Sequence, residues 1–199
     1  MHRGLIKVSD LNKNDYVKSY DSNKMEWTYS RFIFFLHKDD ESNTEYISIK
    51  TSSNKNLLIS SMHLIAKKSN NNNNNNIEYV LAKDLKQNDI LISSSNDNDE
   101  IIIDLNKVIE KGAYAPLLES GTISVNNILA SCYANTKWHK LAHFAFQPII
   151  KISNYFNVDS TTTTTSTNDL LLPNGVNWYV RLLSSFLPYI PMSSNLVTF

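Results

Sequence analysis

Residues 111–134, KGAYAPLLESGTISVNNILASCYA, contain two short apolar runs and the single cysteine of the chain. The first run, residues 123–125, is closed by an Asn-Asn pair, and the second, residues 128–131, leads directly into Cys132. Asparagine tolerates the positive φ that tight hairpin turns require, so the pattern predicts a β-hairpin that holds Cys132 rigidly. A lone free cysteine is more often a small buried hydrophobic residue than a reactive thiol, and the residues alone leave both interpretations open.

The composition is that of one globular domain, or of one domain with a tail. The chain has 199 residues, of which 42% are hydrophobic, and this is enough to build a core. Nineteen Lys and Arg balance nineteen Asp and Glu, so the net charge does not support a nucleic-acid partner. We expect the protein to be a monomer. One cysteine allows no internal disulfide. The sequence shows neither a signal peptide nor an apolar run long enough to span a membrane.

An eight-residue unit occurs twice, as DLNKNDYV at residues 10–17 and as DLKQNDIL at residues 84–91. Both copies begin D-L-x-x-N-D and continue into β-branched, aromatic or aliphatic residues. Asp and Asn ahead of a strand favour a turn, because their side chains bond the local backbone. Two copies of one supersecondary unit predict two halves related by pseudo-symmetry.

The remaining pattern separates a β-rich part from a helical tail. Short apolar or aromatic runs that predict strands stand at residues 27–36, 46–49, 57–59, 90–92 and 101–103. Short strands at close spacing favour an all-β domain, which we place at residues 1–136. A helical period follows, which Pro148 disturbs, and a second helical run begins at Tyr179, so residues 137–199 are predicted to form an amphipathic tail. The asparagine-rich residues 69–76 and the threonine-rich residues 160–168 are predicted to be solvated loops.

Few residues offer reactive chemistry. Ser60 and His63 follow the predicted strand 57–59, so both can lie at one strand end, where imidazole can serve acid–base chemistry. An S-x-x-H motif is weak by itself, because a histidine near a strand end is more often structural. In the tail, His143 lies among apolar residues and is predicted to be a packing or interface residue. Trp178 and Tyr179 begin an apolar stripe that suits either a sterol or membrane interface or packing against the β-domain.

Several motifs together resemble the C-terminal autoprocessing domain of hedgehog proteins, a member of the hedgehog/intein (Hint) family. They are G-x-Y-A-P-L, G-T-x-x-V and A-S-C-Y-A within residues 112–134. The runs LAHFAF at residues 141–146 and GVNWY at residues 175–179 are similar to the tail of the same family. The resemblance covers almost the whole chain and implies an all-β, pseudo-twofold Hint disk, followed by a short amphipathic helical tail that recognises a sterol or a membrane.

The resemblance also implies a two-step reaction. A cysteine at the start of the domain attacks the preceding carbonyl and forms a thioester, assisted by a T-x-x-H motif that Ser60 and His63 match with serine in place of threonine. A sterol hydroxyl, activated by an aspartate, then attacks the thioester, and the upstream signalling segment leaves with the sterol. His37 takes the place of that aspartate; an imidazole can accept a proton near neutrality but lacks the negative charge. Cys132 matches the second cysteine of the family.

The resemblance predicts where the site residues should lie and what the protein should do. Ser60, His63 and Cys132 should converge on one cleft with His37 at its rim, while Trp138, His143, Trp178 and Tyr179 should contact the sterol or membrane. The implied activity is that of a self-processing cysteine endopeptidase with cholesterol transferase activity, which needs no cofactor and takes cholesterol or another sterol as acyl acceptor. Its partners would be that sterol or a membrane surface and the upstream segment, in the secretory pathway or outside the cell.

Two other functions compete with autoprocessing. The opening strand of the family, with its Gly-Cys-Phe junction, is not found ahead of Ile6. We therefore expect a truncated or degenerate domain, which leaves enzymatic activity open. The alternative is an inactive Hint module that binds a lipid or a protein. Protein splicing is not favoured, because the chain continues far past its β-domain and has no terminal His-Asn.

Overall fold

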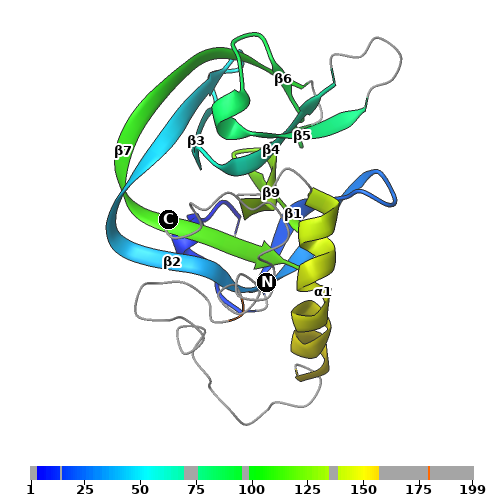
Figure 1. The fold of residues 1–199 in the computed structure, drawn as a ribbon. Coiled ribbons are helices and arrows are strands. Elements are labelled where there is room, and N and C mark those ends of the chain that lie inside the picture. Colours follow the sequence, from blue (N-terminus) through cyan, green and yellow to red (C-terminus); the bar gives the residue numbers. More distant parts are fainter. Residues whose placement is uncertain are drawn as a thin grey trace.

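The computed structural model describes residues 4–13, 15–69, 76–95, 99–134 and 139–156, together with Tyr179. Antiparallel strands make up most of these residues, and one α-helix follows them (Figure 1). The elements are η1 (Val8–Asp10), β1 (Tyr16–Asp21), β2 (Glu26–Thr51), β3 (Asn56–Ser60), β4 (His63–Lys68), β5 (Ile77–Leu81), η2 (Ala82–Asp84), β6 (Ile90–Leu91), β7 (Glu100–Leu118), β8 (Thr122–Val125), β9 (Ile128–Ala134) and α1 (His139–Phe156). The predicted fold class, mostly β with a helix in the tail, is confirmed.

Two long strands form the frame of the molecule. Strand β2 has 26 residues and β7 has 19, and they pair antiparallel in a strongly curved ribbon (Figure 1). The sequence predicted two short strands, residues 27–36 and 46–49, in place of β2, and one, residues 101–103, in place of β7, because polar residues follow these runs. Register shifts, one of them between Asp39 and Asn43, let the pairing continue through the polar residues. The Asp39 carboxylate accepts the backbone N–H groups of Glu41 and Ser42 at 2.9 and 3.1 Å, so these residues form a bulge within β2.

The two copies of the repeated unit adopt the same local structure. A single 3-10 turn, η1 or η2, ends at the first residue of each copy, and the sixth residue of each copy is an aspartate whose carboxylate accepts the N–H of the residue three positions earlier, at 2.7 and 2.9 Å. The carbonyl of Asp15 then accepts the N–H of Phe32 at the start of the buried part of β2. The carbonyl of Asp89 accepts the N–H of Ile102 near the start of β7 in the same way. The predicted duplication is therefore visible as matched turns on the two long strands.

The hairpin predicted around the Asn-Asn pair is also present. Strands β8 and β9 pair antiparallel, and Asn126 and Asn127 take φ values of 49° and 64° at the turn. Strand β9 is longer than predicted and contains Cys132 instead of ending before it. On its other edge β9 pairs with β4, so the hairpin connects the β7 end of the ribbon to β4.

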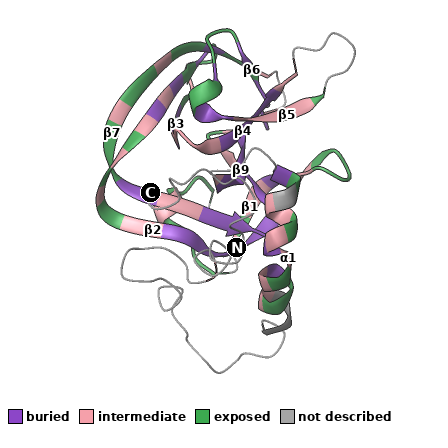
Figure 2. Ribbon diagram, in the orientation of Figure 1, coloured by how far each residue is buried: buried purple, intermediate pink, exposed green. Residues whose placement is uncertain are grey.

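The core lies where the ribbon, β4 and β9 face one another, and buried positions concentrate there (Figure 2). Among its fully buried side chains are Phe32, Ile49, Leu117 and Ile128. Helix α1 packs on β9, where the ring of Phe146 stacks on Tyr133 at 5.3 Å between centroids.

The tail differs from the expectation at one point. Helix α1 runs through Pro148 to Phe156, although proline has no N–H for the helical hydrogen bond and was expected to disturb the period. Among the described residues, no helix combines the length and the apolar character that a membrane crossing requires. Residues 70–75, 135–138 and 157–178 lie outside the description, so both loop predictions and the domain boundary near residue 136 stay predictions.

Candidate functional site

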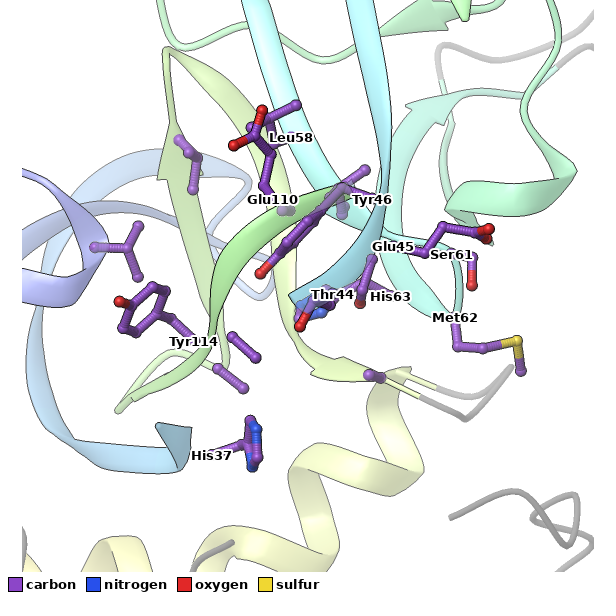
Figure 3. A pocket seen from close by; sticks show the side chains of 18 of the residues that line it. His37, Thr44, Glu45, Tyr46, Leu58, Ser61, Met62, His63, Glu110 and Tyr114 are labelled. Atoms are coloured by element: carbon purple, nitrogen blue, oxygen red, sulfur yellow. The ribbon is translucent and has the colours of Figure 1, made fainter. Parts of the chain in front are cut away.

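A cavity of about 800 Å³ opens between the ribbon, the β3–β4 turn and strand β9. Three of the four predicted catalytic residues, Ser60, His63 and His37, line it. Figure 3 shows His63 and Tyr46 on one side of the cavity and His37 at a separate end of it. Residues far apart in the sequence therefore meet here because the curved ribbon brings β2 and β7 against β4 and β9.

His63 begins β4, and its ring has a defined orientation. Its Nε2 lies 2.8 Å from the backbone carbonyl oxygen of Ser131. A carbonyl only accepts hydrogen bonds, so Nε2 carries the proton and Nδ1 keeps its lone pair. Burial lowers the pKa of His63, and the bond to the Ser131 carbonyl opposes part of that shift. At neutral pH His63 is thus a neutral imidazole whose Nδ1 can accept a proton.

The Ser131 carbonyl is available because β9 bulges at this point. Pairing between β4 and β9 joins Ile65 to Ala130 and His63 to Ala134, so three residues of β9 lie opposite one residue of β4. Such an irregularity removes backbone groups from the regular ladder and re-aims them. Here it turns the carbonyl of Ser131 toward the imidazole of His63.

The side chain of Ser131 holds this bulge from within. Its Oγ accepts the N–H of Tyr133 at 3.0 Å and lies 2.9 Å from Nδ1 of His139, the first residue of α1. The imidazole of His139 is 9% exposed and stacks on Tyr79 with 4.3 Å between ring centroids. Mainly because it is buried, His139 has a pKa lowered to about 4, so its ring is neutral at pH 7. Sequence reasoning missed Ser131 and His139; the serine inside the apolar A-S-C-Y-A motif was the available signal.

Cys132 differs from the expectation, because it does not line the cavity. Successive side chains of a strand point to opposite faces, so the residue after Ser131 turns into the core, where it is 1% exposed. Its backbone N–H donates to the carbonyl of Gly121 at 2.9 Å. Burial raises the pKa of its thiol to about 12, and the protonated form is a poor nucleophile. Of the two interpretations of this cysteine, the structure supports the small buried hydrophobic residue.

Ser60 ends β3 and pairs with Tyr46 of β2. The hydroxyl of Tyr46 donates to the carbonyl of Gly112 at 2.8 Å and so ties β2 to β7 beside the cavity. Gly112 has φ +94°, and a Cβ there would overlap the ring of Tyr114, which explains the glycine of the G-x-Y motif. Sequence reasoning did not select Tyr46, which lay inside an alternating strand pattern without any special signal.

His37 lies within β2, opposite Ala115 of β7, and is only 5% exposed. Burial lowers its pKa, and the negative charge of Asp39 opposes that shift. Its imidazole is therefore neutral at pH 7. The carboxylate of Asp39 is bonded to the backbone of its own bulge and does not line the cavity, so His37 is the better placed of the two to meet an acceptor hydroxyl.

Two of the predicted contact residues of the tail, His143 and Tyr179, pack on the protein itself. The Gln147 amide donates to Nε2 of His143 at 2.7 Å, which leaves Nδ1–H to donate to the hydroxyl of Tyr133 at 2.8 Å. The hydroxyl of Tyr179 donates to the carbonyl of Ala145 at 3.1 Å, while its ring contacts Phe146 edge-on. Tyr179 thus follows the packing alternative. Trp138 and Trp178 lie outside the described residues, so a sterol or membrane contact of the tail stays a prediction.

Within the described part of the chain, no three histidine, cysteine or acidic side chains are arranged to hold a metal ion. The lowered pKa values of His37 and His63, both of which line the cavity, suit proton transfer between neutral imidazoles and groups brought into it.

Comparisons with known proteins agree with this architecture. The Hint module family matches residues 1–190. Warthog protein 6 of Caenorhabditis elegans is 32% identical over 189 residues, which are 93% of this chain and 31% of that protein. Sonic hedgehog protein of Danio rerio is 29% identical over 189 residues, covering 90% of this chain and 44% of its own length. The chain thus spans less than half the length of these curated relatives.

Among solved structures, the gp41-1 intein superposes with a TM-score of 0.50, covering 65% of this chain and 88% of the intein. The sequence identity in that comparison is 17%, so the likeness shows a shared fold alone.

Proposed function

This chain belongs to the Hint family of the hedgehog and warthog proteins, and we propose that it is the autoprocessing domain of a hedgehog-type precursor. In this function it converts the peptide bond behind an upstream segment into a thioester and transfers that segment to a sterol. The observation that carries the proposal is the cavity that Ser60, His63 and His37 line.

The first step uses His63 as both base and acid. Its Nδ1 lone pair accepts the proton of the attacking thiol, the sulfur adds to the carbonyl carbon, and the same proton passes to the nitrogen as the C–N bond breaks. Ser60 contributes a hydroxyl beside the reacting carbonyl. The buried thiol of Cys132 does not fit the nucleophile, so the proposal assigns that role to a cysteine joined ahead of the matched residues.

The second step uses His37. Its neutral imidazole accepts the proton of the acceptor hydroxyl as that oxygen attacks the thioester; the C–S bond then breaks, and the leaving thiolate takes up the proton that His37 accepted. The sterol acceptor, the upstream signalling segment, the membrane surface and the secretory compartment are parts of this proposal, and they rest on the family resemblance.

The test joins a reporter segment ending in Gly-Cys-Phe to the chain and separates precursor from product on a gel. Dithiothreitol should release the reporter, and cholesterol should release it in a sterol-linked form. His63→Ala should abolish both reactions, and a Ser in place of the junction cysteine serves as the inactive control. A precursor that stays intact with dithiothreitol, although it is folded, would refute the proposal.

A second candidate is a Hint module that only binds a lipid or a protein. The burial of Cys132, the single cysteine of the chain, favours it. The transcript ahead of Met1 separates the two candidates. An in-frame Gly-Cys-Phe preceded by a secreted segment supports the processing enzyme, whereas a stop codon supports the binding module.

A further inference from the structure

A continuous path of hydrogen bonds leads from the tail helix α1 to the imidazole of His63. It runs from His139 to the hydroxyl of Ser131, and from the carbonyl of Ser131 to Nε2 of His63, over distances of 2.9 and 2.8 Å. We propose that Ser131 and His139 are positioning residues, which fix the orientation and the tautomer of His63 for the first step of the reaction. This inference rests on the proposed function and adds a role for the tail helix in the chemistry of the β-domain.

One hydrogen bond joins the side chains of Ser131 and His139. The Oγ of Ser131 accepts the N–H of Tyr133, and its other partner among the described residues is Nδ1 of His139. A hydroxyl has one proton and two lone pairs, so Oγ donates to Nδ1 in one His139 tautomer and accepts from Nδ1–H in the other, and both tautomers keep this bond. Stacking on Tyr79 fixes the plane of the His139 ring. The hydroxyl of Ser131 is thus held from two sides.

The bulge makes this restraint matter for His63. On one edge Ser131 pairs with Thr122 of β8, which restrains its backbone, whereas on the edge that faces His63 it lies outside the regular β4–β9 ladder. The restraint on the Ser131 side chain adds to the pairing with β8 in directing the carbonyl at His63. When the carbonyl faces Nε2, the proton of neutral His63 stays there and Nδ1 remains the acceptor that the thiol needs. If the carbonyl turned away, the two tautomers would mix and the ring could rotate.

The inference can be tested on the 199-residue chain without any reaction. Long-range ¹⁵N NMR of the imidazole rings distinguishes the Nε2–H from the Nδ1–H tautomer. We expect His63 to be entirely Nε2–H in the unaltered chain, and to become a mixture in Ser131→Ala and in His139→Phe, which keeps the ring stack but removes the nitrogen that bonds Ser131. Ser131→Thr restores a hydroxyl and should restore the single tautomer.

Tyr133→Phe is the matched control. It removes the hydroxyl that bonds His143 and so weakens the same strand–helix contact, but it leaves the path through Ser131 intact. His63 should keep its tautomer in this variant. An unchanged His63 tautomer in both Ser131→Ala and His139→Phe would overturn the inference, as would an equal change in Tyr133→Phe. If one of the two variants does not fold, the other decides.

A second measurement follows the reaction in the precursor described above. Dithiothreitol cleavage should slow roughly tenfold in Ser131→Ala and His139→Phe, and not in Tyr133→Phe, because misplacing a catalytic group by a fraction of an ångström costs about this much. Without the Ser131 carbonyl the pKa of His63 falls, so the acidic limb of the pH–rate profile should move to lower pH. If the unaltered precursor fails to cleave while the His63 tautomer responds to the variants as expected, the proposed function is refuted and the positioning role of Ser131 and His139 still holds.

Discussion

At the residue scale, the family resemblance predicts that His37 stands where hedgehog proteins carry an aspartate, with an imidazole in place of a carboxylate. A carboxylate stabilises the positive character that develops as a hydroxyl gives up its proton, whereas neutral His37 offers no standing charge. We expect His37→Asp to raise sterol transfer roughly tenfold and to leave dithiothreitol cleavage nearly unchanged. Gel separation with each nucleophile in turn measures both. Equal sterol transfer before and after the change would show that His37 does not activate the acceptor.

Gly121 leaves room for the side chain of His143 on helix α1. Its φ is +73°, and a Cβ there would overlap the ring of His143. Gly121→Ala should therefore lower the free energy of unfolding by about 2 kcal/mol or more, of which about 1 kcal/mol is backbone strain. Gly4→Ala is the matched control, because Gly4 has φ +69° and nothing near its missing Cβ. Urea unfolding of both variants separates the overlap from the strain; equal losses would mean that His143 moves aside freely.

The sequence identified some of these residues and not others, for physical reasons. Ser60, His63 and His37 could be predicted, because a strand end and a family motif mark them. The face to which Cys132 turns could not, since it depends on a bulge in β9 that no local pattern encodes. His139 was missed because its role depends on the contact of α1 with β9, two elements that only tertiary packing brings together.

At the scale of the elements, the two repeated turns allow a matched comparison. Both aspartates accept a backbone N–H, but Asp89 also forms a buried ion pair with Lys67 at 2.9 Å. Asp15→Ala should lower the free energy of unfolding by about 1 kcal/mol or more, because it removes at least the turn hydrogen bond from the N–H of Asn12. Asp89→Ala should cost about 3 kcal/mol or more, because it leaves the ammonium of Lys67 buried without this partner. Denaturant unfolding measures both, and equal effects would contradict the assignment.

The lengths of β2 and β7 show where prediction of elements fails. The hydrophobic alternation located most of the strands and the hairpin turn. It could not show that polar residues such as Asp39 continue the strand, because a carboxylate that caps its own backbone in a bulge has the same sequence signature as one in a loop.

At the scale of the whole molecule, acid should destabilise the fold. Burial lowers the pKa values of all four histidines of the described residues: His37, His63, His139 and His143. The unfolded chain therefore binds more protons than the folded chain below pH ~6.5, and stability that is fully present above that pH is lost as the pH falls toward 4. For His139, with a folded pKa of about 4, the loss approaches about 3 kcal/mol.

Urea unfolding at a series of pH values measures this dependence. His139→Phe should flatten the curve between pH ~6.5 and about 4, because that residue then no longer binds a proton in the unfolded chain. A flat curve in the unaltered protein would contradict the burial of these imidazoles.

The pairing of β2, from the first half of the chain, with β7, from the second half, has a consequence for folding. Because β2 pairs with β7, and β4 pairs with β5, β6 and β9, a cut between residues 69 and 76 would divide half of the strand pairs of the described residues, including the long β2–β7 ribbon, between two fragments. Each fragment alone would expose long unpaired strand edges and should aggregate. Co-expressed, the two should be recovered as a soluble one-to-one complex on size-exclusion chromatography. Soluble, folded single fragments would contradict this prediction, because they would show that one half folds by itself. If neither fragment folds alone, the β-domain is a single cooperative unit that can fold only after the last residues of β9 have been synthesised.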